Sequence, residues 1–433
     1  MSIQSADARV GRDHDYQGAK SAAWIAFALT FLLNVFDYVD RQIVVSMLPD
    51  IKTEWVLSDT QLGALVSVVS LTVAIMSLPV AILADRWSRV KCIALMAIVW
   101  SLATIACGYA VNYFQLVSLR GIVGIGEAGY GAVGTALLAT LFPSRMRAFI
   151  LASLQAGAVV GAIGGVILGG VITRHLGWHS AFGIVGVPGL ILAVLFFFVR
   201  DYKAPKLAPK RTTGFKPLGG AGPILRQILK TPSTITVFLC NGFQYFVFST
   251  MVAWLPSFMH RSYNLPTDKA AMRTAIILIA TTVGAMLWGA VADRMSRKNK
   301  TAKYSVMSFT TFMTFVVLGF AFNFLSPGPA QYGTLVFGAI FLGGTIGTVS
   351  ASAMDVALPA VRSTTVAIGT LIQVLTGFAA GPVVSGMLSD AFGLSTALAI
   401  VPLASLLATI GFILTRPIYG RDLDHAAARD AVS

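Results

Sequence analysis

Residues 81–91 read AILADRWSRVK, and residues 289–298 read GAVADRMSRK. Both stretches contain an Asp-Arg-x-Ser-Arg turn, and the second copy follows the first by 208 residues in a chain of 433. Each copy stands where a long apolar segment ends and a basic loop begins. A charged turn repeated at half the chain length, between long apolar segments, predicts a membrane protein built from two related halves.

The composition supports a membrane protein independently of the repeat. Hydrophobic residues make up 56% of the chain and charged residues 12%, and the mean hydropathy is +0.77. Apolar runs of about 20 residues span a bilayer, and lipid forces them to be helical because it cannot satisfy backbone polar groups. We therefore predict an all-α membrane protein with twelve transmembrane helices in two pseudo-symmetric six-helix bundles. The predicted spans are 22–48, 59–84, 92–110, 113–141, 147–173, 178–199, 233–258, 269–292, 304–325, 333–357, 363–391 and 394–416.

The spans divide the chain into five segments. Between the halves, lysines alternate with prolines, which is typical of an extended linker. The expected segments are an N-terminal tail (1–21), a first six-helix bundle (22–199), a linker (200–232), a second six-helix bundle (233–416) and a C-terminal tail (417–433).

The net charge of +14 reflects membrane topology rather than a nucleic-acid partner. With the N-terminus placed inside, 25 of the 32 Lys and Arg residues fall on that side and 5 on the other. Basic loops stay in the cytoplasm, so both termini are expected there. Residues 1–20 are polar and charged, which predicts that no signal peptide is cleaved. We expect a multi-pass protein of the cell membrane, in a bacterium the inner membrane.

The chain carries no pattern typical of an enzyme or of a metal or cofactor site. Its three cysteines have no paired spacing, and none of its five histidines falls in the middle of a span. No G-x-x-x-x-G-K-S/T motif is present, which argues against an ATP-driven pump. We expect no enzymatic activity, no cofactor and no metal.

A second internal echo involves small residues. The fifth and eleventh spans both carry a Gln followed by Gly-x-x-x-Gly: Gln155, Gly157 and Gly161 in the fifth, and Gln373, Gly377 and Gly381 in the eleventh. Glycines four residues apart let helices approach closely. The surface they form serves either tight static packing or a sliding interface between the halves.

Charged residues inside the first half indicate a functional cavity. Five fall within predicted spans: Asp37, Asp40, Arg41, Arg120 and Glu127. Each costs at least ~2.5–3.5 kcal/mol at membrane depth unless it is paired or hydrated. The three on the first helix share a face, and the two on the fourth share a face about 10 Å apart along the axis.

These charges support two interpretations. A carboxylate that loses its arginine partner to an anionic substrate binds a proton more readily, which is a basis for proton coupling. Alternatively, Asp40 or Glu127 forms static ion pairs with Arg41 or Arg120 that hold the helices in register.

The chain resembles transporters of the major facilitator superfamily along its whole length. The repeated turn is similar to that superfamily's G-x-x-x-D-R-x-x-R-x-K signature, with Ala81 at the first glycine position. The resemblance implies that the turn residues gate the cytoplasmic side. The alternative is that these arginines only enforce topology. The implied gate residues are Asp85, Arg86, Arg89, Asp293, Arg294 and Arg297.

Within that superfamily, the charged spans are similar to the Spinster group of lipid transporters. Residues 37–41 read DYVDR and residues 120–130 read RGIVGIGEAGY, against N-Y-x-D-R and R-G-x-V-G-x-G-E-A-x-Y in that group. Asp37 replaces the usual Asn and adds a negative charge. The resemblance implies proton-linked movement of lysophospholipids or phosphorylated sphingoid lipids. The other polar candidates for the cavity are Asn34, Tyr38, Tyr130, Asn241 and Gln244.

Three functions remain open from the sequence. The first is a proton-linked secondary transporter of an amphiphilic anionic substrate, such as a lysophospholipid or sphingoid lipid. The second is a transporter of the same kind that carries a small organic anion or a drug. The third is a non-transporting membrane receptor or channel. One chain contains all the predicted helices, so we expect a monomer.

Overall fold

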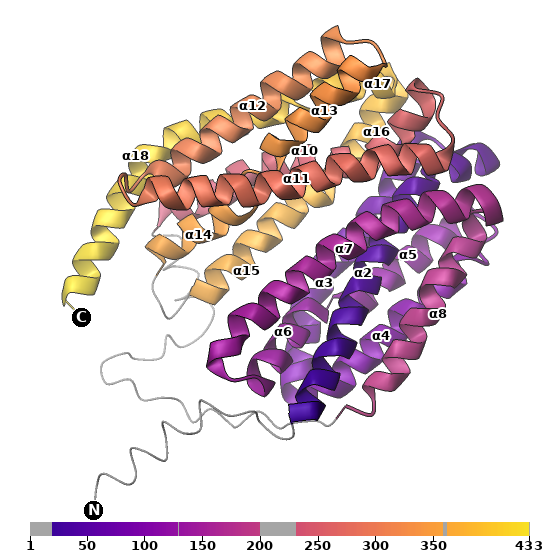
Figure 1. The fold of residues 1–433 in the computed structure, drawn as a ribbon, viewed down its shortest axis with the longest axis horizontal. Coiled ribbons are helices and arrows are strands. Elements are labelled where there is room, and N and C mark those ends of the chain that lie inside the picture. The colour runs from indigo at the N-terminus through magenta and orange to yellow at the C-terminus, as the bar shows by residue number, and fades with distance from the viewer. Residues whose placement is uncertain (1–19, 129, 200–230, 358–361, 433) are drawn as a thin grey trace, which may run out of the picture. The chain divides into compact units, whose positions relative to one another are not determined.

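The computed structural model describes residues 20–128, 130–199, 231–357 and 362–432, and within them it is built of helices without strands (Figure 1). Helices of the first half are α2 (Lys20–Trp55), α3 (Asp59–Arg86), α4 (Arg89–Cys107), α5 (Tyr113–Glu127), α6 (Tyr130–Leu141), α7 (Ser144–Leu176) and α8 (Trp178–Phe196). Those of the second half are α10 (Pro232–Ser262), α11 (Thr267–Ser296), α12 (Ala302–Phe324), α13 (Pro329–Leu342), α14 (Ile346–Val356), α15 (Arg362–Gln373), the π-helix η3 (Val374–Phe378), α16 (Ala380–Phe392), α17 (Leu394–Ile400) and α18 (Leu403–Val432).

Eleven helical stretches in the described residues are long and apolar enough to cross a membrane. The prediction of an all-α membrane protein is therefore confirmed. The predicted fourth span is present as two shorter helices, because α5 ends at Glu127 and α6 begins at Tyr130. The residues expected as a C-terminal tail continue α18 to Val432. The predicted linker lies outside the described residues except for its end, 231–232.

The chain forms two compact units. The first comprises Met1–Trp55 and Val68–Lys210, and the second comprises Val56–Ser67 and Arg211–Ser433. The first turns of α3 thus belong to the second unit, while the rest of that helix belongs to the first. The predicted division of the chain into two six-helix bundles joined by a linker stays a prediction.

Local sequence signals fix where several helices begin and end. Ser88 of the repeated turn caps α4, since its hydroxyl accepts a hydrogen bond from the Lys91 amide at 3.1 Å. Gly177 ends α7 at φ +80° and Gly393 ends α16 at φ +83°, and in both places the next helix starts at once. Left-handed backbone of this kind favours glycine because it has no Cβ. The two halves therefore share this turn as well.

The glycine echo packs helices within each unit. In the first unit α7 lies along α2 (Figure 1), and a Cβ at Gly161 would overlap the carbonyl oxygen of Val35. In the second, a Cβ at Gly377 would lie 2.5 Å from the Tyr245 Cβ on α10. Small residues thus bring the first helix of each half against a later helix of the same half.

Candidate functional site

Arg41 on α2 lies between two carboxylates. Its Nε is 3.4 Å from the Asp37 Oδ2 one turn earlier and 2.9 Å from the Glu127 Oε2 at the end of α5. The Arg41 side chain is 27% exposed, whereas the side chains of Asp37 and Glu127 are 5% and 0% exposed. Of the three side chains, that of Arg41 is the most accessible to a ligand.

Asp40 and Arg120 form a separate, sealed ion pair. The Arg120 Nη1 donates to the Asp40 Oδ2 at 3.0 Å, and the Thr104 hydroxyl on α4 donates to the Asp40 Oδ1 at 3.0 Å. The side chains of Arg120 and Asp40 are 2% and 0% exposed. The pair connects α2 to α5 and α4 and leaves no room for a ligand between its members.

Two glycines allow α5 to approach its neighbours. A Cβ at Gly126 would lie 2.6 Å from the backbone nitrogen of Trp100 on α4, and one at Gly124 would overlap the Thr72 hydroxyl on α3. This close packing brings both Arg120 and Glu127 within reach of α2. Neighbouring helices α3 and α4 thus occupy the space that these glycines leave free.

A pocket of about 190 Å³ opens beside Arg41. Most of the residues that line it have polar side chains, and the Arg41 guanidinium carbon lies 5.4 Å from the ring centroid of Tyr38. Apart from the ion pairs with Arg41, Asp37 Oδ1 and both Glu127 oxygens are buried without a hydrogen-bond partner among the described residues. The lining residues are Thr30, Asn34, Asp37, Tyr38, Arg41, Gly131, Gly134, Thr135, Leu154 and Gln155.

The predicted polar candidates are only partly gathered at this pocket. Asn34 and Tyr38 line it, with the Asn34 amide donating to the Leu154 carbonyl at 2.8 Å. Asn241 and Gln244 belong to the second unit and are 0% and 1% exposed. The side chain of Tyr130 lies outside what the structure describes.

The Gln244 side chain forms hydrogen bonds with three other residues of the same chain. Its Nε2 donates to the Thr314 hydroxyl at 3.2 Å and to the Leu342 carbonyl at 3.3 Å, and its Oε1 accepts from the Ser405 hydroxyl at 2.7 Å. Leu342 is the last residue of α13, and the carbonyl groups at the end of a helix have no partner within the helix. The Gln244 amide donates to one of them. These contacts connect α10 to α12, α13 and α18, and a role of Gln244 in the cavity stays a prediction.

The structure describes more side chains in the second copy of the repeated turn than in the first. The side chains of Asp85 and Arg86 lie outside the described set, and Arg89 begins α4. In the second copy, the side chains are exposed at the end of α11 and form no ion pair with another described residue. These are Asp293, Arg294 and Arg297. The gating role stays a prediction.

Comparison with known proteins now connects these features to a family. Residues 30–380 match the family model of the Major Facilitator Superfamily. The chain belongs to the major facilitator superfamily. It is therefore a multi-pass membrane protein of a transporter superfamily, in agreement with the resemblance drawn from the repeated turn.

The relatives of this chain include spinster homologues and a muconate transport protein. It is 27% identical over 394 residues to protein spinster homolog 1 of Xenopus laevis, covering 84% of this chain and 73% of that protein. It is also 27% identical over 376 residues to the cis,cis-muconate transport protein of Acinetobacter baylyi, covering 86% and 89%. The expected relation to the Spinster group is confirmed.

Solved structures share the fold. A bacterial homologue of the human lysosomal transporter Spinster, crystallised in an inward-facing and unoccupied conformation, aligns with a TM-score of 0.84 at 22% identity. The alignment covers 94% of this chain and 99% of that one. The nucleoside transporter NupG, crystallised as a point mutant, aligns with a TM-score of 0.70 at 13% identity and covers 91% of this chain and 99% of that one. At these identities the likeness concerns the fold alone.

The sequence analysis did not identify Thr104 or the Asp59–Arg261 ion pair. Thr104 gives no signal, since a lone threonine in an apolar span is ordinary. The pairing of Asp59 with Arg261 joins residues 202 apart, and no local spacing indicates it. The Ser58-x-x-Gln61 pattern before α3 is a recognisable capping box, and the structure forms both of its hydrogen bonds.

Proposed function

We propose that this protein is a proton-linked secondary transporter that works by alternating access and moves an amphiphilic anionic substrate, such as a lysophospholipid or a sphingoid lipid. One observation carries the proposal: a partly exposed arginine lines a polar pocket and lies between two buried carboxylates. The kinship with spinster homologues supports the lipid.

The charge balance of this site supports proton coupling. If Asp37, Arg41 and Glu127 are all ionised, they have one excess negative charge in a buried environment. Such a charge is costly away from water unless it is compensated. An anionic headgroup bound to the guanidinium adds a further negative charge. A proton taken up by Glu127 or Asp37 offsets it, so substrate and proton bind together.

The two arginines have different roles in this proposal. Arg41 holds the anionic group of the substrate, because it lines the pocket and keeps part of its surface exposed. Arg120 and Asp40 hold α2 against α5, since both are almost fully buried and neither lines the pocket. The two interpretations of the charges then apply to different residues. Asp40 and Arg120 form the static ion pair, and Arg41 binds the substrate.

A small organic anion is the second candidate substrate. The pocket is lined by several polar side chains and is only about 190 Å³ in volume, which suits a compact dicarboxylate. The muconate transport protein is a relative over 89% of its own length. The same arginine and carboxylates would serve this cargo.

Orientation, location and gating complete the proposal. Both termini lie in the cytoplasm, the membrane is the bacterial inner membrane, and the protein works as a monomer. Asp85, Arg86 and Arg89, with their counterparts Asp293, Arg294 and Arg297, gate the cytoplasmic side. The excess of basic residues on one side supports the orientation.

Identification of co-purified lipids by mass spectrometry separates the two cargoes. The lipid proposal expects an enriched lysolipid that is lost in Arg41→Ala and retained in Lys269→Ala, a matched loss of an exposed cation outside the pocket. No enrichment, together with uptake of muconate into proteoliposomes, favours the small anion. If Arg41→Ala binds the lysolipid and muconate as well as the wild type does, Arg41 is not part of the binding site.

Coupling is tested by uptake driven by a pH gradient in proteoliposomes. Glu127→Gln should remove most of the dependence on the gradient, because the substituted amide cannot take up the proton. Asp355→Asn is the control, as this carboxylate pairs with Lys303 and the Tyr419 hydroxyl in the second unit. Equal gradient dependence in Glu127→Gln and the wild type excludes Glu127 from the coupling.

A further inference from the structure

Arg273, in the second turn of α11, lies over two tyrosine rings. Its guanidinium carbon is 5.7 Å from the ring centroid of Tyr263 and 5.3 Å from that of Tyr332. Tyr263 follows the end of α10 and Tyr332 belongs to the first turn of α13, so the contact joins three helices of the second unit. A cation within about 6 Å of a ring centroid is attracted by the negative face of the ring. The rings therefore restrict where the guanidinium lies.

Both tyrosine rings are fixed by hydrogen bonds of their hydroxyl groups. The Tyr263 hydroxyl donates to the Gln331 Oε1 at 2.8 Å, and Gln331 is 2% exposed. The Tyr332 hydroxyl donates to the backbone carbonyl of Arg273 at 3.1 Å. The tyrosines thus offer their rings to the guanidinium, while their hydroxyl protons bind other groups. An arginine that is already held in this way loses less side-chain entropy when it binds a ligand.

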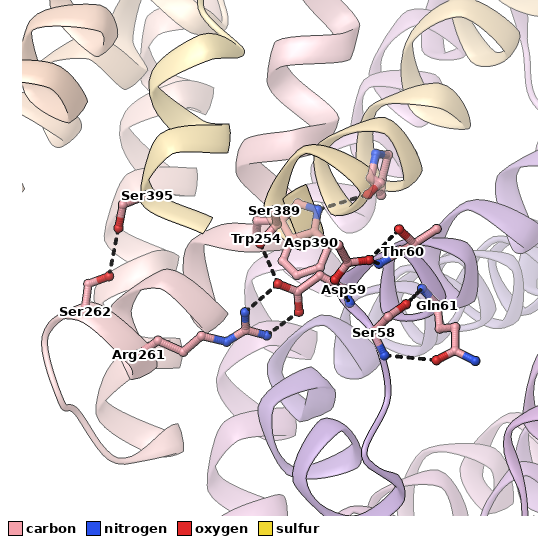
Figure 2. Close-up of polar contacts among 11 residues, drawn as sticks. Ser58, Asp59, Thr60, Gln61, Trp254, Arg261, Ser262, Ser389, Asp390 and Ser395 are labelled. Carbon is pink, nitrogen blue, oxygen red and sulfur yellow. Dashed lines mark hydrogen bonds and ion pairs between the residues drawn. The ribbon is translucent and has the colours of Figure 1, made fainter. Parts of the chain in front are cut away.

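The side-chain N–H groups of Arg273 have no acceptor in the described part of the chain. They form no hydrogen bond and no ion pair with another described residue. Arg261 at the end of α10 provides the contrast, because its guanidinium donates two hydrogen bonds to the Asp59 carboxylate, each 2.8 Å long (Figure 2). A guanidinium has five N–H donors, and contact with a ring face satisfies none of them in a hydrogen bond. Arg273 is partly exposed, so an anion from outside the chain can reach these donors.

An exposed apolar stripe on α11 places Arg273 at the edge of the acyl chains. Its members recur every three or four residues, which puts them on one face of the helix, and they are between 46% and 53% exposed. They are Met272, Ile276, Ile279 and Val283. In a membrane such a face lies against lipid, and tyrosine rings gather where the acyl chains end and the headgroups begin. Arg273 stands beside the end of the stripe nearest the start of α11, which is the level of the headgroups.

We propose that Arg273, Tyr263 and Tyr332 form a binding site for the headgroup phosphate of a membrane phospholipid, whose acyl chains lie along the apolar stripe of α11. The guanidinium donates two parallel hydrogen bonds to phosphate oxygens, a geometry that arginine favours, and the rings hold it in place. Charge complementarity supports this occupant, since Arg273 is one of only five Lys and Arg residues predicted on the outer side. The site belongs to the second unit and does not depend on the cargo proposed for the Arg41 pocket.

Native mass spectrometry of the purified full-length protein in dodecyl maltoside measures the affinity for the first bound lipid. All proteins carry Arg41→Ala, so that lipid held by that arginine does not contribute. The probe is dioleoylphosphatidylglycerol, added after the endogenous lipid has been removed. Arg273→Ala should bind it about tenfold more weakly than the parent protein, which corresponds to about 1.4 kcal/mol. Dioleoylglycerol has the same chains without the phosphate, and both proteins should bind it equally.

Companion variants separate the charge from the geometry. Arg273→Lys keeps the charge and loses the planar fork, whereas Tyr332→Leu keeps the arginine and loses one ring. Each should weaken binding by a smaller factor than Arg273→Ala does. Lys269→Ala is the matched control, because Lys269 is exposed one turn earlier on α11 and forms no cation–π contact with a described ring, and it should bind as the parent does. Should Arg273→Ala fail to fold, Arg273→Lys and Tyr332→Leu decide the question.

Each of three outcomes would overturn this site. If Arg273→Ala and its parent bind dioleoylphosphatidylglycerol equally, the arginine and the rings only brace the three helices. If Lys269→Ala weakens binding as much as Arg273→Ala does, the lipid is attracted by positive charge in general. If an equal concentration of inorganic phosphate displaces the lipid, the site binds the free anion. The proposed transport is tested apart from this, since uptake into proteoliposomes can fail while the phospholipid still binds at Arg273.

Discussion

Breaking the sealed Asp40–Arg120 pair should destabilise the protein strongly, and replacing both members should not. The two side chains are 0% and 2% exposed, and Thr104 also donates to Asp40. Arg120→Leu leaves a buried carboxylate with one neutral donor, so we expect a loss of about 3–5 kcal/mol in the free energy of unfolding. In Asp40→Leu/Arg120→Leu no charge remains, and most of that loss should be recovered.

The assay is reversible unfolding of the purified protein in dodecyl maltoside micelles titrated with sodium dodecyl sulfate. Tryptophan fluorescence reports on the transition, since Trp100 is fully buried in α4 beside α5. Arg297→Leu, which removes an exposed arginine at the end of α11, is the control and should cost little. Wild-type stability in Arg120→Leu, or equal destabilisation in the single and double variants, would refute the reasoning.

Two further predictions use the same unfolding titration. Gln244→Leu removes the donor to the Leu342 carbonyl and should lower the free energy of unfolding by about 1–3 kcal/mol, because buried polar groups lose their partner. An unchanged midpoint of the unfolding transition would show that water replaces the amide. Gly126→Ala places a methyl group 2.6 Å from the Trp100 nitrogen and should cost about 1–3 kcal/mol. Gly164→Ala, where no atom of the described residues would lie within 4 Å of the added Cβ, should be neutral or slightly stabilising, and equal effects of the two would contradict the close packing of α5.

The architecture was largely predictable from the sequence. Apolar runs of bilayer length define the helices, and the repeated Asp-Arg-x-Ser-Arg turn defines the two halves. The sequence did not show that the predicted fourth span is present as two shorter helices, of which α5 ends at Glu127 and α6 begins at Tyr130. Hydropathy is averaged over a window, so it does not show where one helix ends and the next begins within an apolar run.

The site was predictable as a set of charges but not as pairs. The i,i+4 spacing of Asp37 and Arg41 indicates their contact, which the structure contains. Whether Glu127 meets Arg41 or another charge of the set depends on how closely α5 approaches α2, and that distance is set by tertiary packing. The Asp59–Arg261 contact has the same character, since its members are far apart in sequence and ordinary in type.

The central claim is that binding of an anion at Arg41 brings a proton into the carboxylates around it. Calorimetric titration of the purified protein with its substrate anion, lysophospholipid or dicarboxylate, in buffers of different ionisation enthalpy measures proton exchange directly. We predict net proton uptake on binding by the wild type, and its loss in Asp37→Asn/Glu127→Gln with binding retained. A binding heat that is independent of the buffer in the wild type would contradict the claim.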